Sequence, residues 1–148
     1  MPYSTDNDIV DRLGEERVRR LTDDANAGSI DSTRLARVRE EATQIVDTYI
    51  RGRYDLPLPT PAPQLLVQIE TDVLAHRLYR RRANVDIPDS VQSGYDEAMD
   101  MLKALSSGRI KLGIDTEGDG EDDSKPVYKT RGDEPIFIDK INRYIDNY

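Results

Sequence analysis

The segment Pro63–Arg82, with the sequence PQLLVQIETDVLAHRLYRRR, decides the fold. Its apolar side chains recur at intervals of three and four residues, which is the spacing of an amphipathic α-helix. They are Leu65, Leu66, Ile69, Val73, Leu74, Leu78 and Tyr79. Together they cover a surface that is wider than a single stripe. A helix with so broad an apolar surface needs neighbours on several sides, so we predict that it lies at the centre of a bundle.

A second long helix is predicted before this segment. Between Leu35 and Ile50 one apolar stripe repeats with the helical period. Asp31 or Ser32 is expected to cap its start, and Gly52 is suited to its end. Four prolines from Pro57 to Pro63 then forbid a helix and favour a stiff, extended connection.

Three shorter or flanking helices complete the expected fold. Residues 5–13 form the first, with Thr5 or Asp6 as its cap, and residues 15–21 form the second after a break at Gly14. Residues 89–106 form the last, which Gly108 ends. The predicted fold class is therefore mainly α, a small bundle of about five helices with an extended C-terminal arm or tail.

The pattern changes after Gly108. Residues 109–114 alternate polar and apolar side chains, which predicts a short strand or an extended arm. Residues 115–124 are acidic and contain glycine, as in a linker. The last residues are amphipathic again, and the candidate interface residues there are Ile136, Phe137, Ile138, Ile141, Tyr144, Ile145 and Tyr148. We therefore divide the chain into a helical domain, 1–112, and a tail, 113–148, whose apolar face packs either on its own core or on a partner.

Composition and charge restrict the function. The 148 residues include 21 basic and 29 acidic side chains, a formal net charge of −8, of which −5 belongs to residues 113–148. This acidity argues against general affinity for nucleic acid. The longest apolar run has three residues, so no membrane partner is expected. No secretory signal is expected at the start, and the lack of cysteine excludes a disulfide or a thiol nucleophile.

No residue pattern points to catalysis. The single histidine, His76, falls on the apolar stripe of the central helix, where a packed side chain is expected rather than a catalytic one. We predict no enzyme activity, no metal and no cofactor. The basic patch Arg77, Arg80, Arg81 and Arg82 is the candidate interface. It can meet carboxylates of another subunit or phosphate, or it can pair within the chain, for example with Glu70 or Asp72.

Several stretches carry a resemblance to a known family through their order and spacing. They are Tyr3-Ser4-Thr5 with Arg12–Glu16, Leu21-Thr22-Asp23 with Gly28–Asp31, Ile45–Leu58 (IVDTYIRGRYDLPL), Asp72–Tyr79 and Ser107–Gly113. Over residues 3–114 the chain resembles the phage Mu-like head–tail connector, or adaptor, family. The acidic tail departs from that resemblance, because members of the family tend to end in a short basic and aromatic segment.

The resemblance implies a structural virion protein of the neck, assembled in the host cytoplasm. Such adaptors are small helical bundles that dock on the portal protein as a homo-oligomeric ring, commonly of twelve subunits. The ring extends the channel through which DNA passes without sequence-specific binding, and it receives the next tail-side neck protein. The alternative is a small helical DNA-binding or DNA-packaging accessory protein that uses the Arg77–Arg82 patch.

Overall fold

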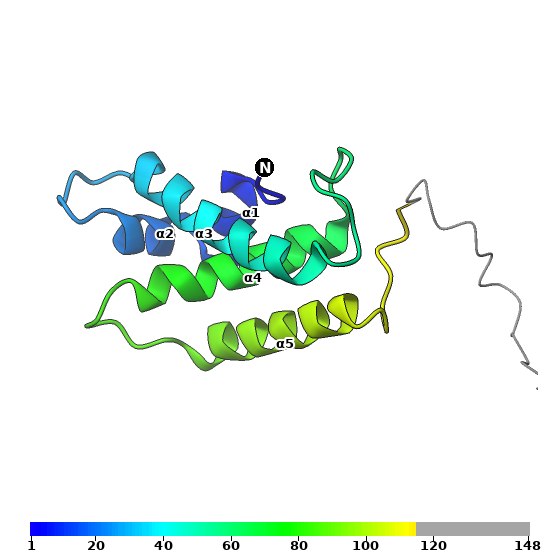
Figure 1. Ribbon diagram of the computed structural model, residues 1–148. Helices are drawn as coiled ribbons and strands as arrows, with labels where there is room; N and C mark the ends of the chain where they lie inside the picture. Colours follow the sequence, from blue (N-terminus) through cyan, green and yellow to red (C-terminus); the bar gives the residue numbers. More distant parts are fainter. Residues whose placement is uncertain (115–148) are drawn as a thin grey trace, which may run out of the picture. The chain divides into compact units, whose positions relative to one another are not determined.

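The computed structural model describes residues 1–114, which form five helices and no strand (Figure 1). They are α1 (Asp6–Leu13), α2 (Glu15–Thr22), α3 (Ser32–Ile50), α4 (Gln64–Arg80) and α5 (Asp89–Ser106). The predicted mainly helical bundle is confirmed. None of these helices is both long enough and apolar enough to cross a membrane.

Helix α4 is the centre of the bundle, as predicted. It contacts each of the other four helices, and Figure 1 shows α3, α4 and α5 side by side with alternating directions. Leu66, Leu74 and Leu78 of α4 are fully buried. Each such leucine contributes about 1.5–3 kcal/mol relative to an exposed one, so the breadth of the apolar surface on α4 explains its central place.

The helix starts follow local capping chemistry. The Thr5 hydroxyl accepts a hydrogen bond from the Asp8 backbone N–H at 3.4 Å, and the Asp8 carboxylate accepts one from the Thr5 N–H at 2.6 Å. The hydrogen bonds that the Thr5 hydroxyl and the Thr5 N–H donate to this carboxylate lower the pKa of Asp8, and the reciprocal pair with the Thr5 hydroxyl forms a capping box. The Asp31 carboxylate caps α3 by accepting from the Arg34 backbone N–H at 2.9 Å. Thr5 and Asp31 were each one of two predicted caps.

The ends of α3 and α5 differ in kind. Gly108 ends α5 with a φ of 75°, while the N–H groups of Gly108 and Arg109 donate to the carbonyls of Leu105 and Ala104, as in a Schellman motif. Gly52 directly follows the C-cap residue Arg51, as predicted, but it does not adopt the left-handed conformation of such a glycine. Helix α3 ends at Ile50, and the Ile50 carbonyl accepts from two later N–H groups in a tight turn that needs no left-handed residue.

The predicted strand at residues 109–114 does not form. The N–H groups of Arg109 and Ile110 both donate to the Ala104 carbonyl, and the Leu112 N–H donates to the Tyr54 hydroxyl at 3.0 Å. These backbone groups therefore bind to the end of α5 and to a side chain from the loop after α3. An alternating pattern forms a strand only where a second strand accepts its backbone hydrogen bonds, and residues 1–114 provide none.

A buried carboxylate ties the N-terminal segment to the core. Glu70 of α4 is completely buried, and it accepts hydrogen bonds from the Ser4 backbone N–H and from the Thr43 hydroxyl of α3. Burial lowers the pKa of the neighbouring Arg39, and the charge of Glu70 opposes that shift. The bundle therefore contains a polar junction where the apolar pattern of α4 predicts only packing.

Candidate functional site

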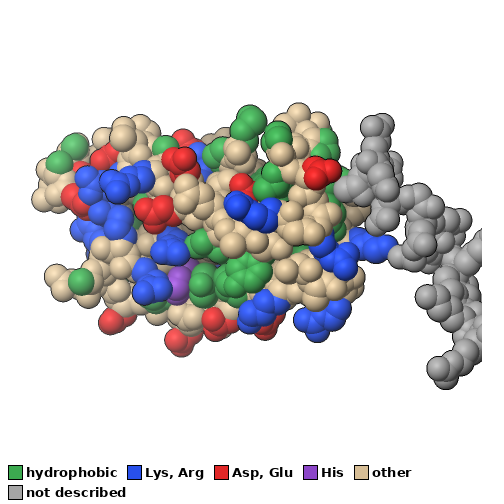
Figure 2. Space-filling model, viewed as in Figure 1, with side chains coloured by type: hydrophobic (Ala, Val, Ile, Leu, Met, Phe, Trp, Pro, Cys, Tyr) green, Lys and Arg blue, Asp and Glu red, His purple; other side chains and the backbone are tan. Residues whose placement is uncertain are grey.

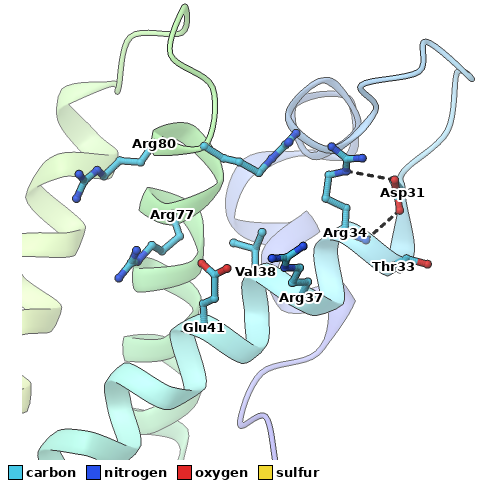
Figure 3. Close-up of a pocket in the computed structure, with 9 residues that line it drawn as sticks. Asp31, Thr33, Arg34, Arg37, Val38, Glu41, Arg77 and Arg80 are labelled. Atoms are coloured by element: carbon cyan, nitrogen blue, oxygen red, sulfur yellow. Dashed lines mark hydrogen bonds and ion pairs between the residues drawn. The ribbon is translucent and has the colours of Figure 1, made fainter.

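A groove of about 620 Å³ lies between the start of α3 and the end of α4 (Figure 3). Five of its nine lining residues are arginines and two are carboxylates. The lining residues are Asp31, Thr33, Arg34, Arg37, Val38, Glu41, Arg77, Arg80 and Arg81. Figure 2 shows a group of basic side chains over this end of the bundle, and further basic side chains over the opposite end. The groove is therefore a concentration of positive charge on a chain that is acidic overall.

Helical spacing explains how two segments far apart in the sequence build one groove. On α3, Arg34, Arg37 and Glu41 lie three and four residues apart and share a face. Arg80 lies three residues after Arg77 at the end of α4, and the C-cap residue Arg81 lies four residues after Arg77. Because α3 and α4 run in opposite directions, the start of one lies beside the end of the other (Figure 1).

Arg81 and Arg82 are engaged within the chain. Both guanidinium nitrogens of Arg81 donate to the Asp24 carboxylate, at 2.7 and 2.6 Å, and Arg82 donates to the same carboxylate at 2.7 Å. Arg34 of α3 also forms an ion pair with Asp24. Arg81 and Arg82 also donate to the backbone carbonyls of Leu21 and Asp23. These contacts hold the loop after α2 against the end of α4.

The loop itself is ordered by Asp23. Its carboxylate accepts hydrogen bonds from the backbone N–H groups of Ala27 and Gly28, at 2.8 and 2.7 Å, and these bonds lower the pKa of Asp23. Gly28 has a φ of 81°, which a residue with a side chain rarely adopts. The turn therefore places Asp24, the next residue after Asp23, where three arginines reach it.

The other arginines of the groove have no such partner. Among the described residues, no carboxylate lies within ion-pair distance of Arg37, Arg77 or Arg80. Figure 3 shows the Arg77 and Arg80 side chains extending from α4 away from α3, with Glu41, Val38 and Arg37 along the α3 side of the groove. The groove thus presents three guanidinium groups that are available to an anion.

The structure therefore divides the predicted basic patch. Arg77 and Arg80 line the groove without an ion-pair partner, whereas Arg81 and Arg82 are held by Asp24. The carboxylates that the sequence suggested as partners are bound elsewhere. Glu70 is in the core, and Asp72 pairs with Arg12 at 2.7 Å. Sequence reasoning missed Arg37. The one signal that could have found it is its position three residues after Arg34, which places both arginines on the same face of α3.

His76 packs between α4 and α5. Its ring stacks on Tyr95 with the ring centroids 3.9 Å apart, and its Nε2 atom lies 3.3 Å from the Gln92 side-chain oxygen. Burial lowers the pKa of His76; the contact with Gln92 opposes this shift, and the charges of Arg80 and Arg77 add to it. His76 is only 5% exposed, so it is a packed side chain, as the sequence predicted, and it joins two helices.

Comparisons with known proteins place this fold and groove in a family. The model of the family described as bacteriophage Mu, Gp36 matches residues 3–129. The Mu-like prophage FluMu protein gp36 of Haemophilus influenzae is 30% identical to the chain over 106 residues, which cover 72% of this chain and 67% of that protein. The chain belongs to the bacteriophage Mu Gp36 family. It is thus a Mu-like phage protein, and all five helices and the groove of this Gp36-family protein lie within the matched range.

The rest of the predicted interface of this Gp36-family protein lies beyond the described residues. These positions are Ile136, Phe137, Ile138, Ile141, Tyr144, Ile145 and Tyr148. Within residues 1–114, no three histidine, aspartate or glutamate side chains are grouped so that they would hold a metal ion. The arginine groove is therefore the candidate site that residues 1–114 provide, and the chemistry it supports is the binding of an anion.

Proposed function

We propose that this phage protein is a structural, non-enzymatic component of the virion neck. In this proposal it is a head–tail adaptor, assembled in the host cytoplasm, that docks on the portal protein as a homo-oligomeric ring. The ring extends the DNA channel and receives the next tail-side neck protein. Membership in the Mu Gp36 family supports a phage structural or morphogenetic role, and the small helical bundle is compatible with a ring subunit.

The observation that carries this proposal is the arginine groove. Interfaces between subunits that fold before they assemble are polar at their edges, and arginine is enriched among the residues that dominate binding energy. Arg37, Arg77 and Arg80 are charged groups that the fold positions without an ion-pair partner in residues 1–114. In the proposal they contact a neighbouring subunit, while the C-terminal segment 136–148 contacts the portal.

The net charge of the chain supports passage of DNA rather than its capture. At −8 the chain repels a phosphate backbone, except close to the groove. A channel wall of this charge lets DNA slide through without sequence-specific contacts.

The proposed location is tested on virions. Antibody-labelled electron microscopy of the phage that encodes this chain should find the protein between head and tail. A phage without it should accumulate DNA-filled heads and free tails. Intact virions from the phage that lacks the protein, or its absence from purified virions, would refute the neck assignment.

The proposed portal contact has its own test. The full chain should co-sediment with the portal protein of the same phage, and a chain without residues 133–148 should not. A chain with Lys125 and Lys129 changed to glutamine is the matched control, because it alters the tail without touching its apolar face or its acidic segment. Equal co-sedimentation of the truncated chain would exclude the tail as the portal contact.

The same groove favours one alternative, a DNA-binding or DNA-packaging accessory protein. Three available arginines that each neutralise a phosphate would make the logarithm of the DNA affinity fall with the logarithm of salt concentration, with a slope of about −3. The adaptor proposal expects no such binding of duplex DNA at physiological salt. A steep salt-dependent affinity that Arg37→Glu, Arg77→Glu and Arg80→Glu abolish together would favour the alternative.

A further inference from the structure

The shape and charge of the groove restrict its ligand. It is a concave space of about 620 Å³ between two helices, with Val38 among the residues that line it and arginines on both sides. A space of this size suits an extended peptide of a few residues, whereas the backbone of duplex DNA is a convex surface.

Arginine adds a preference for carboxylates. Its planar guanidinium donates two parallel hydrogen bonds to one carboxylate, which is the geometry that Arg81 and Asp24 already show beside the groove. Arg37, Arg77 and Arg80 present three more such groups on two helices. The complementary ligand is therefore a peptide with several closely spaced carboxylates.

The chain itself contains one such peptide. Residues 115–123 read DTEGDGEDD, with six carboxylates and no basic residue. The described part of the chain ends at Ile114, shortly after Leu112 donates its N–H to Tyr54 at the end of the bundle where α3 stops. The groove lies at the opposite end, because Arg37 is 13 residues before Ile50, or about 20 Å along α3.

This separation indicates which copy supplies the peptide. An extended chain advances at most about 3.3–3.6 Å per residue, so Asp115 and Glu117 of the same copy fall well short of the groove. From the same copy only the last carboxylates, Glu121, Asp122 and Asp123, are within the length of an extended chain, whereas another copy can place the whole segment in the groove.

We propose that the groove of one copy binds the acidic segment 115–123 of a second copy, through Arg37, Arg77 and Arg80. This inference deepens the proposed function, because it names the partner of a contact between ring subunits. The contact consists of exposed ion pairs, so it is weakened by salt.

A disulfide experiment on the full chain tests the contact, and the absence of natural cysteine makes it specific. One copy carries Thr33→Cys, at an exposed position that lines the groove, and a second copy of different mass carries Gly120→Cys in the acidic segment. After mixing and mild oxidation, a disulfide-linked heterodimer should form. A copy with Thr48→Cys, an exposed position about 22 Å further along α3, is the control and should cross-link far less.

Charge reversal then separates a specific contact from random collision. Changing Arg37, Arg77 and Arg80 to glutamate in the groove copy should lower the heterodimer yield about tenfold or more. Changing Asp119, Glu121 and Asp122 to lysine in the other copy should restore the yield with this groove variant. Circular dichroism of each variant confirms that the helices are intact.

Four outcomes would overturn the inference. They are no heterodimer, a disulfide that forms only within a chain carrying both cysteines, a yield that charge reversal leaves unchanged, and displacement of the segment by duplex DNA at physiological salt. None of these outcomes requires the neck or the portal. A failed cross-link beside a protein that is found in the virion neck would therefore refute this contact and leave the proposed function standing.

Discussion

Replacing Glu70 with alanine is expected to destabilise the bundle strongly, because this carboxylate is completely buried and joins three segments. It accepts hydrogen bonds from the Ser4 backbone N–H and from the Thr43 hydroxyl, and its charge favours the charged form of Arg39. Alanine removes the acceptor and the charge together, while the groups that faced them stay where the fold holds them.

The expected loss in the free energy of unfolding depends on which polar groups Glu70→Ala leaves without a partner. The Ser4 N–H loses its acceptor and costs about 1–3 kcal/mol, whereas the Thr43 hydroxyl still donates to the Arg39 carbonyl at 3.0 Å. The half-buried charge of Arg39 also loses a nearby opposite charge, which adds about 1 kcal/mol at the effective dielectric of such sites. The expected loss in the free energy of unfolding is therefore about 2–4 kcal/mol, a large part of the 5–15 kcal/mol that is typical of a domain.

Urea unfolding followed by far-ultraviolet circular dichroism measures this loss, and it suits a helical chain that lacks tryptophan. With a denaturant slope of about 1–3 kcal/mol/M, the midpoint should fall by about 0.7–4 M. Glu70→Gln keeps one carbonyl acceptor and should lie between the wild type and Glu70→Ala. Glu40→Ala, at an exposed position of α3, is the control. A Glu70→Ala midpoint within about 0.3 M of this control would refute the reasoning.

Three further predictions follow from other contacts. Asp24→Ala should lower the free energy of unfolding by only about 1 kcal/mol, since its ion pairs are partly exposed, but amide hydrogen exchange in residues 23–30 should become clearly faster; unchanged exchange would contradict the anchoring role. Gly108→Ala should lower the free energy of unfolding, measured by thermal unfolding, by about 1–2 kcal/mol, because Gly108 has a φ of 75° and a Cβ there would clash with the Arg53 guanidinium. Adding Arg53→Ala should relieve the clash but not the backbone strain. Because the pKa of His76 is lowered in the native state, the unfolded state binds a proton first as the pH falls below about 6.5. The free energy of unfolding should therefore drop between pH 7 and 5.5, and it should drop less in the His76→Gln variant. Equal dependence of the free energy of unfolding on pH in the two proteins would argue against a buried, neutral His76.

The helices were predictable because their causes are local. Apolar spacing over Pro63–Arg82 indicates the central helix, and capping side chains such as Thr5 and Asp31 mark the helix starts within one residue. Two helix ends differ from the local signals. The Ile50 carbonyl accepts from two N–H groups of the following turn, so Gly52 does not adopt a left-handed conformation. Residues 109–114 form no strand, because the Arg109 and Ile110 N–H groups bind the Ala104 carbonyl and the Leu112 N–H binds the distant Tyr54 hydroxyl.

The candidate site was predictable only in part. The sequence showed that Arg77 and Arg80 belong to a dense basic cluster, which composition alone reveals. It did not show that Arg81 and Arg82 are engaged by Asp24, which lies nearly sixty residues away in the chain. Nor did it show that Arg37 of another helix joins the same groove, because that depends on the antiparallel packing of α3 on α4.

The sequence by itself determined the helical class, the approximate positions of the helices, the central place of α4 and the concentration of acidic residues after position 112. Each of these depends on side-chain spacing or composition within a short stretch of chain. Only the tertiary structure decided which charges are available. Whether an arginine is paired depends on where a distant carboxylate lies, and that place is set by the packing of the helices. Asp24 therefore binds Arg81 and Arg82, and Arg37, Arg77 and Arg80 remain to line the groove.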